Sequence, residues 1–449
     1  MDTRTVTLAA TALLAATLAS VSHAACIGDC DASGAVAVNE LVTGVGIALG
    51  NQAARVCVLL DVNGDGRATI DELIAAVTGA LNGCPAGPVT AATVAGTYAD
   101  MMAAGYGESV DAAHGVRDAV DCLVDAPSAA TLQAARSAWL QARPSYLRTE
   151  VARFYDGPID DPDTGVESYV NSWPLDEAYI DYVVGDVGAG IINHPDEYPD
   201  IDAAVLIDAN EAEGETTIST GWHAIEFLLW GQDFSADGPG DRPYADYVTD
   251  GSGTAANQAR RAAYLRSVTD LLVTDLEEVR DAWGAQPDTY RAEFLGADGT
   301  EQLRRILTGL GTLSGGELTG ERMATAYRTK DQEDEHSCFS DNTLVDFRED
   351  ERGIRNVFFG HVGAVRGPGI YDLVRTVDAG VADRARDALQ AAGEAIYAIP
   401  GPFDQAILGS DDAPGRHAIK AALDALNAQT DAIADCAAAL GISISTTGQ

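Results

Sequence analysis

Lysine is almost missing from this sequence, which has only Lys330 and Lys420 in 449 residues. Asp and Glu number 69 against 28 Lys and Arg, so the net charge is −41. A surface of this kind repels the phosphate groups of nucleic acids and of anionic lipids. The composition therefore argues against nucleic acid and anionic membranes as partners. The surface attracts cations in general, although a diffuse field is not a binding site.

Long apolar runs are also missing, except at the N-terminus. Residues 6–21 form an apolar run that ends just before Ser22-His23-Ala24, a cleavage site of the A-x-A type. The run is too short to span a membrane comfortably, and no later stretch approaches the ~20 apolar residues of a membrane helix. Cys26 is not preceded by the leucine of a lipoprotein signal, so simple secretion is favoured. We therefore predict a signal peptide over residues 1–24, no transmembrane segment, and a mature protein in the periplasm or outside the cell.

Cysteine is scarce, and its distribution is uneven. Of seven cysteines, four lie at positions 26, 30, 57 and 84, and the others lie at 122, 338 and 436. An exported protein can keep disulfides. The first four predict two disulfides within a small module, and the sequence leaves their pairing open. The remaining three leave one odd cysteine, and Cys338 is expected to take part in a disulfide.

Two stretches of this module have the spacing of EF-hand calcium loops. Such a loop places short oxygen-bearing side chains at positions 1, 3 and 5, a glycine at 6, a backbone carbonyl ligand at 7 and a bidentate glutamate at 12. Gly34 and Gly66 stand at position 6 of the two stretches. We predict two calcium sites, with ligands Asp29, Asp31, Ser33, the Ala35 carbonyl and Glu40 in the first and Asp61, Asn63, Asp65, the Arg67 carbonyl and Glu72 in the second.

Each loop is followed by a helical pattern, but no long helix is expected before it. This arrangement resembles dockerin modules, which carry two such calcium repeats and bind cohesin domains, and it implies a cohesin-like or cell-surface protein partner. The repeats are spaced more widely than in a typical dockerin and the cysteines depart from the pattern, so a calcium module for stability or tethering is an equal alternative. We assign residues 26–84 to this module and residues 85–96, with Pro85, Gly87 and Pro88, to a linker.

The rest of the chain has the apolar periodicity of helices. Leu265, Val268, Leu272 and Leu276 recur at helical spacing within a helix predicted over 257–283. Similar stripes occur over 110–123, 132–142 and 419–433. No run of alternating apolar and polar residues indicates strands. The pattern predicts an all-α fold built by packing helix against helix.

One helical stretch combines apolar residues with a potential metal-binding pair. His223 and Glu226 lie three residues apart within GWHAIEFLLWGQD, so their side chains share one face of a helix. A buried imidazole or carboxylate needs a partner, which can be a metal ion. The alternative is a purely structural hydrogen bond between the two side chains.

The surrounding motif resembles the imelysin-like family. GxHxxE, here Gly221, His223 and Glu226, is the signature of that family, and the stretches 134–160, 171–183, 319–327 and 332–347 resemble it as well. The resemblance implies an all-helical double bundle over residues 97–449, with two related halves at about 97–250 and 251–449. It also implies metal binding, with iron or another transition metal at one site, and a role as an iron-binding or iron-uptake accessory protein.

Two further ligands are expected to face the His223–Glu226 pair. Glu177, on a short helix, and His336, within the 332–347 stretch, are the candidates, although Glu177 could equally be a solvated charge at a helix start. A zinc-dependent peptidase of the imelysin type is one alternative. Phe227 occupies the position where an H-x-x-E-H motif would need its second histidine. The other alternative is a non-catalytic interaction protein with a structural His–Glu pair.

Overall fold

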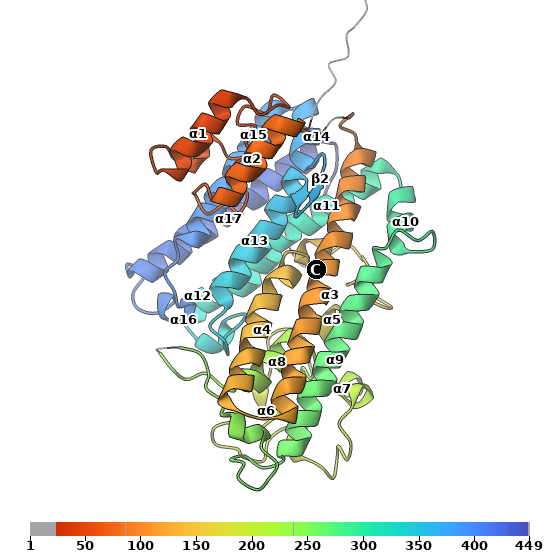
Figure 1. Cartoon of the computed structure of the whole chain (residues 1–449), viewed down its shortest axis with the longest axis vertical. Helices are drawn as coiled ribbons and strands as arrows, with labels where there is room; N and C mark the ends of the chain where they lie inside the picture. Colours follow the sequence, from red (N-terminus) through yellow and green to blue (C-terminus); the bar gives the residue numbers. More distant parts are fainter. Residues whose placement is uncertain (1–23, 86, 237, 448–449) are drawn as a thin grey trace, which may run out of the picture.

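The computed structural model describes residues 24–85, 87–236 and 238–447, and its regular secondary structure is almost entirely helical (Figure 1). The all-α prediction is therefore confirmed, and the strands in these ranges are confined to a hairpin of two-residue strands. The predicted signal peptide lies outside the described residues, apart from Ala24. In the described ranges, no helix is both long and apolar enough to cross a membrane.

The N-terminal module consists of α1 (Val38–Ala48), the 3-10 turn η1 (Ala54–Val56) and α2 (Ile70–Asn82). Two disulfides hold it together, Cys26–Cys84 and Cys30–Cys57, as the clustering of the cysteines predicts. Its small core contains Ile27, Ile47, Leu60 and Ala76. Cys122, Cys338 and Cys436 are free thiols, so the expected disulfide at Cys338 is wrong.

The module is packed against the helical bundle through its second loop. Arg355 donates a hydrogen bond of 2.5 Å from Nη2 to the Asp61 carbonyl, and Gln390 Nε2 donates one of 2.7 Å to Asp61 Oδ2. The backbone N–H of Ala25 donates to Asp372 Oδ1 at 2.8 Å. Helix α3 begins at Ala91, so the connection is shorter than the linker expected over 85–96.

The first half of the bundle is formed by α3 (Ala91–Asp125), α4 (Ala129–Leu147), α8 (Gly221–Trp230) and α9 (Gln258–Ala282). Ser128 caps α4 by accepting a hydrogen bond of 3.2 Å from the Thr131 N–H. Val116, Val120, Trp139 and Leu265 lie in the shared core. Short elements lie between the long helices, namely η2 (Glu150–Ala152), α5 (Glu167–Val170), α6 (Glu177–Ile180), η3 (Ile191–Asn193), α7 (Ala203–Ala209) and η4 (Tyr244–Tyr247).

Helix α9 lies after the boundary expected near residue 250, yet it packs against α3 and α8, as Figure 1 shows for α3 and α9, so we describe it with the first half. The periodicity of α9 reveals its apolar face but not which neighbour covers that face. Beyond α9 come α10 (Tyr290–Gly296), α11 (Gly299–Thr312), the π-helix η5 (Leu313–Ala324), α12 (Thr325–Thr329), η6 (Gln332–Asp334), α13 (Thr343–Phe359), β1 (His361–Val362), β2 (Val365–Arg366), α14 (Ile370–Val377), α15 (Ala379–Tyr397), α16 (Phe403–Ala406) and α17 (Pro414–Ala439).

Candidate metal centre

Helix α8 is buried along its whole length, which places its polar residues inside the protein. Gly221 opens the helix with φ +83°, and a Cβ atom there would lie 2.5 Å from the Val170 carbonyl oxygen. Only glycine tolerates both conditions. The glycine of the motif is thus a packing requirement that brings α8 against α5.

His223 is held between a carboxylate and a guanidinium. Its Nδ1 lies 3.0 Å from Glu226 Oε2, and its Nε2 lies 3.2 Å from Arg143 Nη2. Because a guanidinium can only donate, Nε2 must accept, and Nδ1 therefore carries the proton and donates to Glu226. Burial, together with the charge of Arg143, holds the pKa of His223 well below its usual value, so the ring is neutral.

Glu226 orients the histidine and has no free oxygen. Its Oε1 accepts hydrogen bonds from the Ser340 N–H at 2.9 Å and from Ser340 Oγ at 2.6 Å. Its Oε2 accepts the bond from His223. Burial raises the pKa of Glu226 to about 8, although Ser340 donates to it. The sequence predicts Glu226 as a ligand, whereas its contacts fit a residue that positions His223.

His336 stands beside His223 with a carboxylate of its own. The two ring centroids are 4.7 Å apart. His336 Nδ1 lies 2.7 Å from Asp346 Oδ2, and Asp346 also accepts hydrogen bonds from Ser337 and Asn342. Burial lowers the pKa of His336 well below its usual value. The structure thus brings His336 to His223, as the sequence predicts.

Two residues of the centre are missing from the ligands expected from the sequence. Arg143 on α4 contacts His223, Asn171 and Asp346, and Asp346 on α13 contacts His336. Both lie in stretches that resemble the family, which was the available signal. No local sequence pattern identifies these two residues as part of the site, because the partners of Arg143 are up to 203 residues away in sequence.

A buried network of ion pairs adjoins this centre. Arg322 on the π-helix η5 contacts Glu150 at 2.6 Å and Asp350 at 2.8 Å. Asn171 links this network to the centre, because it donates to Glu150 and accepts from Arg143. Glu321, which precedes Arg322 in the sequence, is exposed and takes no part in this network.

Glu177 begins α6 and makes no hydrogen bond to His223, Glu226 or His336 in the described structure. Its carboxyl group lies near that of Glu333. Burial and then the neighbouring Glu177 raise the pKa of Glu333 to about 8. The expected role of Glu177 as a metal ligand therefore stays a prediction.

The first candidate calcium loop draws its acidic side chains together. Carboxylate oxygens of Asp29, Asp31 and Glu40 lie within 4.8 Å of one another, the one such group of three among the described His, Cys, Asp and Glu residues. Asp29 accepts hydrogen bonds of 2.8 Å from the Ser33 and Gly34 N–H groups. Ser33 Oγ donates to the Ala35 carbonyl at 3.2 Å.

The second candidate calcium loop has the same backbone pattern. Asp61 accepts hydrogen bonds from the Asp65 N–H at 3.1 Å and the Gly66 N–H at 2.9 Å. Glu72 accepts from the Val62 and Thr69 N–H groups, both at 2.7 Å. The side chain of Asn63 donates to Asp65, and the Arg67 N–H donates to Asp65 as well. Asp61 differs from its counterpart Asp29 because Gln390 of the bundle also donates to it.

The comparisons with known proteins place most of the chain in one family. The imelysin family model (Peptidase_M75) matches residues 102–433, a range that contains His223, Glu226 and His336 but not the N-terminal module. Iron-regulated protein A of Synechococcus elongatus is 25% identical over 326 residues, which are 70% of this chain and 78% of that protein. A crystal structure described as an iron-regulated protein A precursor from Parabacteroides distasonis superposes with a TM-score of 0.60 at 18% identity, covering 78% of this chain and 94% of that one.

Proposed function

This chain belongs to the imelysin family, and we propose that it is an exported iron-binding protein whose metal site is formed by His223 and His336. The similarity to iron-regulated protein A supports the choice of iron. The likeness to a protein described as a precursor supports export. One observation supports the metal site: in two adjacent imidazoles, Nδ1 lies 3.0 Å and 2.7 Å from an oxygen of a buried carboxyl group, Glu226 and Asp346 respectively.

Carboxylate-bound histidines are typical of metal centres. A ligating histidine usually donates its second ring N–H to a carboxylate, which fixes the tautomer and leaves the other nitrogen for the metal. Glu226 and Asp346 have that role here, and Nε2 of each ring is the proposed ligand atom. Iron accepts imidazole and carboxylate ligands together.

Arg143 controls access to the proposed ligand atom of His223. Its guanidinium now donates to His223 Nε2, so it must turn away before a metal can bind there. Asn171 and Asp346 already accept hydrogen bonds from the same guanidinium and can keep it paired. Metal binding is therefore coupled to a rearrangement of one buried side chain.

The geometry gives less support to a peptidase. A zinc peptidase needs a general base beside the metal-bound water. Both oxygens of Glu226 are already engaged, by His223 and by Ser340. A structural His–Glu pair in an interaction protein would account for the first histidine but not for the second carboxylate-bound ring beside it.

The metal site is tested by measuring bound metal in three histidine variants. We expect the full chain, reconstituted with ferrous or ferric iron in the presence of calcium, to bind one equivalent by elemental mass spectrometry. His223→Ala and His336→Ala should each lose the bound iron, because each variant removes one of the two proposed ligand nitrogens. His417→Ala, an exposed histidine on α17, should keep it. Retention of the iron in both site variants would show that the rings are structural.

For the N-terminal module we propose two calcium ions, bound by the loops 29–40 and 61–72. The side chains at positions 1, 3 and 12 of the first loop already converge. The module resembles a dockerin, but its second loop is packed against the bundle through Asp61. We therefore favour a module that stabilises the bundle over one that is free to bind a cohesin-like partner.

Calcium is expected to raise the thermal stability of the chelated protein. For affinities near 10⁻⁴–10⁻³ M, typical of extracellular sites, ~10 mM calcium should stabilise the folded state by about 1.4–2.7 kcal/mol per site. Differential scanning calorimetry with and without calcium measures the shift. The shift should disappear in the Asp29→Asn/Asp61→Asn double variant and persist in Asp163→Asn, which changes an exposed aspartate. An unchanged melting temperature in the unmodified chain would rule out the calcium sites.

A further inference from the structure

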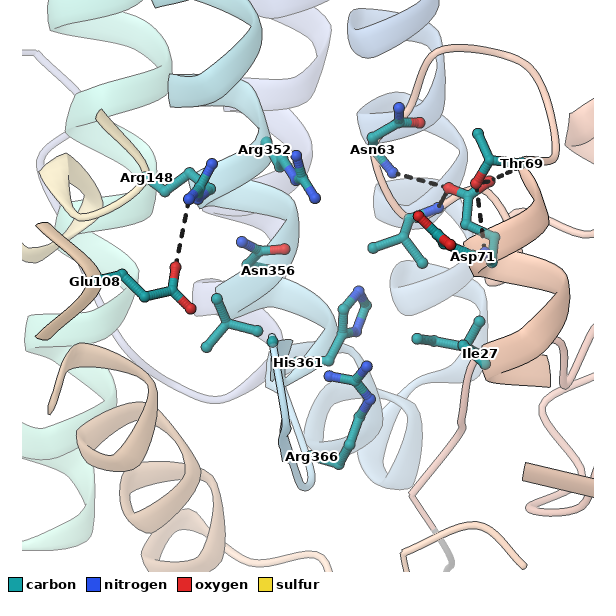
Figure 2. Close-up of a pocket in the computed structure, with 15 residues that line it drawn as sticks. Ile27, Asn63, Thr69, Asp71, Glu108, Arg148, Arg352, Asn356, His361 and Arg366 are labelled. Carbon is teal, nitrogen blue, oxygen red and sulfur yellow. Dashed lines mark hydrogen bonds and ion pairs between the residues drawn. The ribbon is translucent and has the colours of Figure 1, made fainter. Parts of the chain in front are cut away.

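A cleft of about 600 Å³ separates the N-terminal module from the bundle. Figure 2 shows Arg352, His361 and Arg366 on the bundle side, across from Asn63 and Asp71 of the module. The cleft exists because the module is docked through Asp61. It is distinct from the proposed iron site, whose histidines do not line it.

Arginine is concentrated on one wall of this cleft, in a chain whose net charge is −41. Arg366 donates one hydrogen bond to the Val365 carbonyl and forms no ion pair with a described carboxylate. Arg352 has one distant carboxylate neighbour, Glu349 at 3.7 Å. Arg148 forms an ion pair with Glu349 at 2.7 Å, which neutralises much of its charge. Of the three arginines that line the cleft, Arg366 is therefore the one without an ion pair among the described residues, and Arg352 has only the long pair with Glu349.

His361 adds an unpaired acceptor next to Arg366. The two residues are directly opposite each other in the β1–β2 hairpin, so their side chains leave the same face. His361 is buried, and its Nε2 has no hydrogen-bond partner in the described structure. The backbone of Phe359 raises the pKa of the ring, although burial outweighs this effect. In the tautomer that carries its proton on Nδ1, Nε2 is left with a lone pair. Burial, with the charge of Arg366, lowers the pKa of His361 to about 3, which keeps that lone pair free.

We propose that this cleft binds a small hydroxycarboxylate, with its carboxylate on Arg366 and Arg352 and its hydroxyl donating to Nε2 of His361. A guanidinium matches a carboxylate in shape and charge. A buried acceptor such as Nε2 is satisfied only by a donor, which a plain carboxylate lacks. Ile27, Val62 and Val362 also line the cleft and can contact a short carbon chain, whereas the carboxyl groups of the lining are those of Asp71, Glu72 and Glu108.

The proposal is tested with two ligands that differ by one hydroxyl group. We expect isothermal titration of the full chain, with calcium in excess, to show that L-malate binds about tenfold or more tightly than succinate, since the hydroxyl satisfies the buried nitrogen. Arg366→Gln, which alters an exposed side chain, should weaken both ligands by about tenfold or more. His361→Phe should remove only the preference for malate.

The control removes the same charge elsewhere. Arg328→Gln, on α12 and outside the cleft, should leave both affinities unchanged. Equal affinities for malate and succinate, or no binding of either at millimolar concentration, would overturn the proposal. So would an equal effect of Arg328→Gln and Arg366→Gln. Tighter binding of inorganic phosphate than of malate would show a general anion site and reject the hydroxycarboxylate.

Discussion

Replacing Asp181 with alanine is expected to destabilise the protein by about 3–5 kcal/mol, because it leaves two buried guanidinium groups without their carboxylate. Asp181 follows α6 and is fully buried. Its Oδ2 accepts from Arg242 at 2.7 Å and from Arg261 at 2.6 Å, and its Oδ1 accepts from Arg261 at 2.8 Å. Burial alone would raise the pKa of Asp181, but the two arginines hold it below its usual value, so the carboxylate is ionised.

Urea denaturation followed by circular dichroism measures this loss. Asp163→Ala is the matched control, since Asp163 is exposed and its side chain makes no ion pair in the described structure. Asp181→Asn should fall between the two, because it keeps the shape and loses the charge. A loss below about 1 kcal/mol in Asp181→Ala would mean that water or Asp246, which lies 3.4 Å from Arg242, compensates for the missing carboxylate.

Replacing Gly221 with alanine is expected to cost about 2–4 kcal/mol and to abolish iron binding. An alanine at φ +83° is strained, and its Cβ would lie 2.5 Å from the Val170 carbonyl oxygen. Relief of that contact has to move the start of α8, and His223 is only two residues further along. The same substitution should therefore reduce both stability and bound metal.

Gly96→Ala is the control for this substitution. Gly96 lies within α3, and no atom lies within 4 Å of a Cβ built there. Alanine should be neutral or stabilise by up to about 1 kcal/mol, because it favours the helix. Urea denaturation and elemental mass spectrometry on both variants give the two readouts. If Gly221→Ala kept its iron and its stability, the glycine of the motif would have no packing role.

The spacing of residues in the sequence predicts some contacts of the site but not the contacts between distant segments. His223 and Glu226 are close in sequence, so helical periodicity alone predicts their contact. Arg143 and Asp346 are 203 residues apart, and only the packing of α4 against α13 brings them together. Glu177 is predicted as a ligand from the family-like stretch 171–183, but the sequence does not reveal that its neighbour in space is the carboxyl group of Glu333.

The fold, like the site, is predicted from the sequence only in part. The apolar stripes predict the long helices and hence the all-α class. They do not reveal that α9 joins α3, because a stripe carries no information about which neighbour covers it. Clustered cysteines predict the two disulfides of the module, whereas a buried free thiol such as Cys338 has no sequence signature that separates it from a bonded one.

The docking of the module through Asp61 and Ala25 has a consequence for the order of folding. The residues that hold it, Arg355, Asp372 and Gln390, come 294 to 347 residues later in the chain. A chain that is released N-terminus first therefore presents the module long before its docking surface exists. Both disulfides join cysteines within residues 26–84, so they can form before the docking surface of the bundle has folded. The second half of the bundle must then fold onto a partner that is already formed.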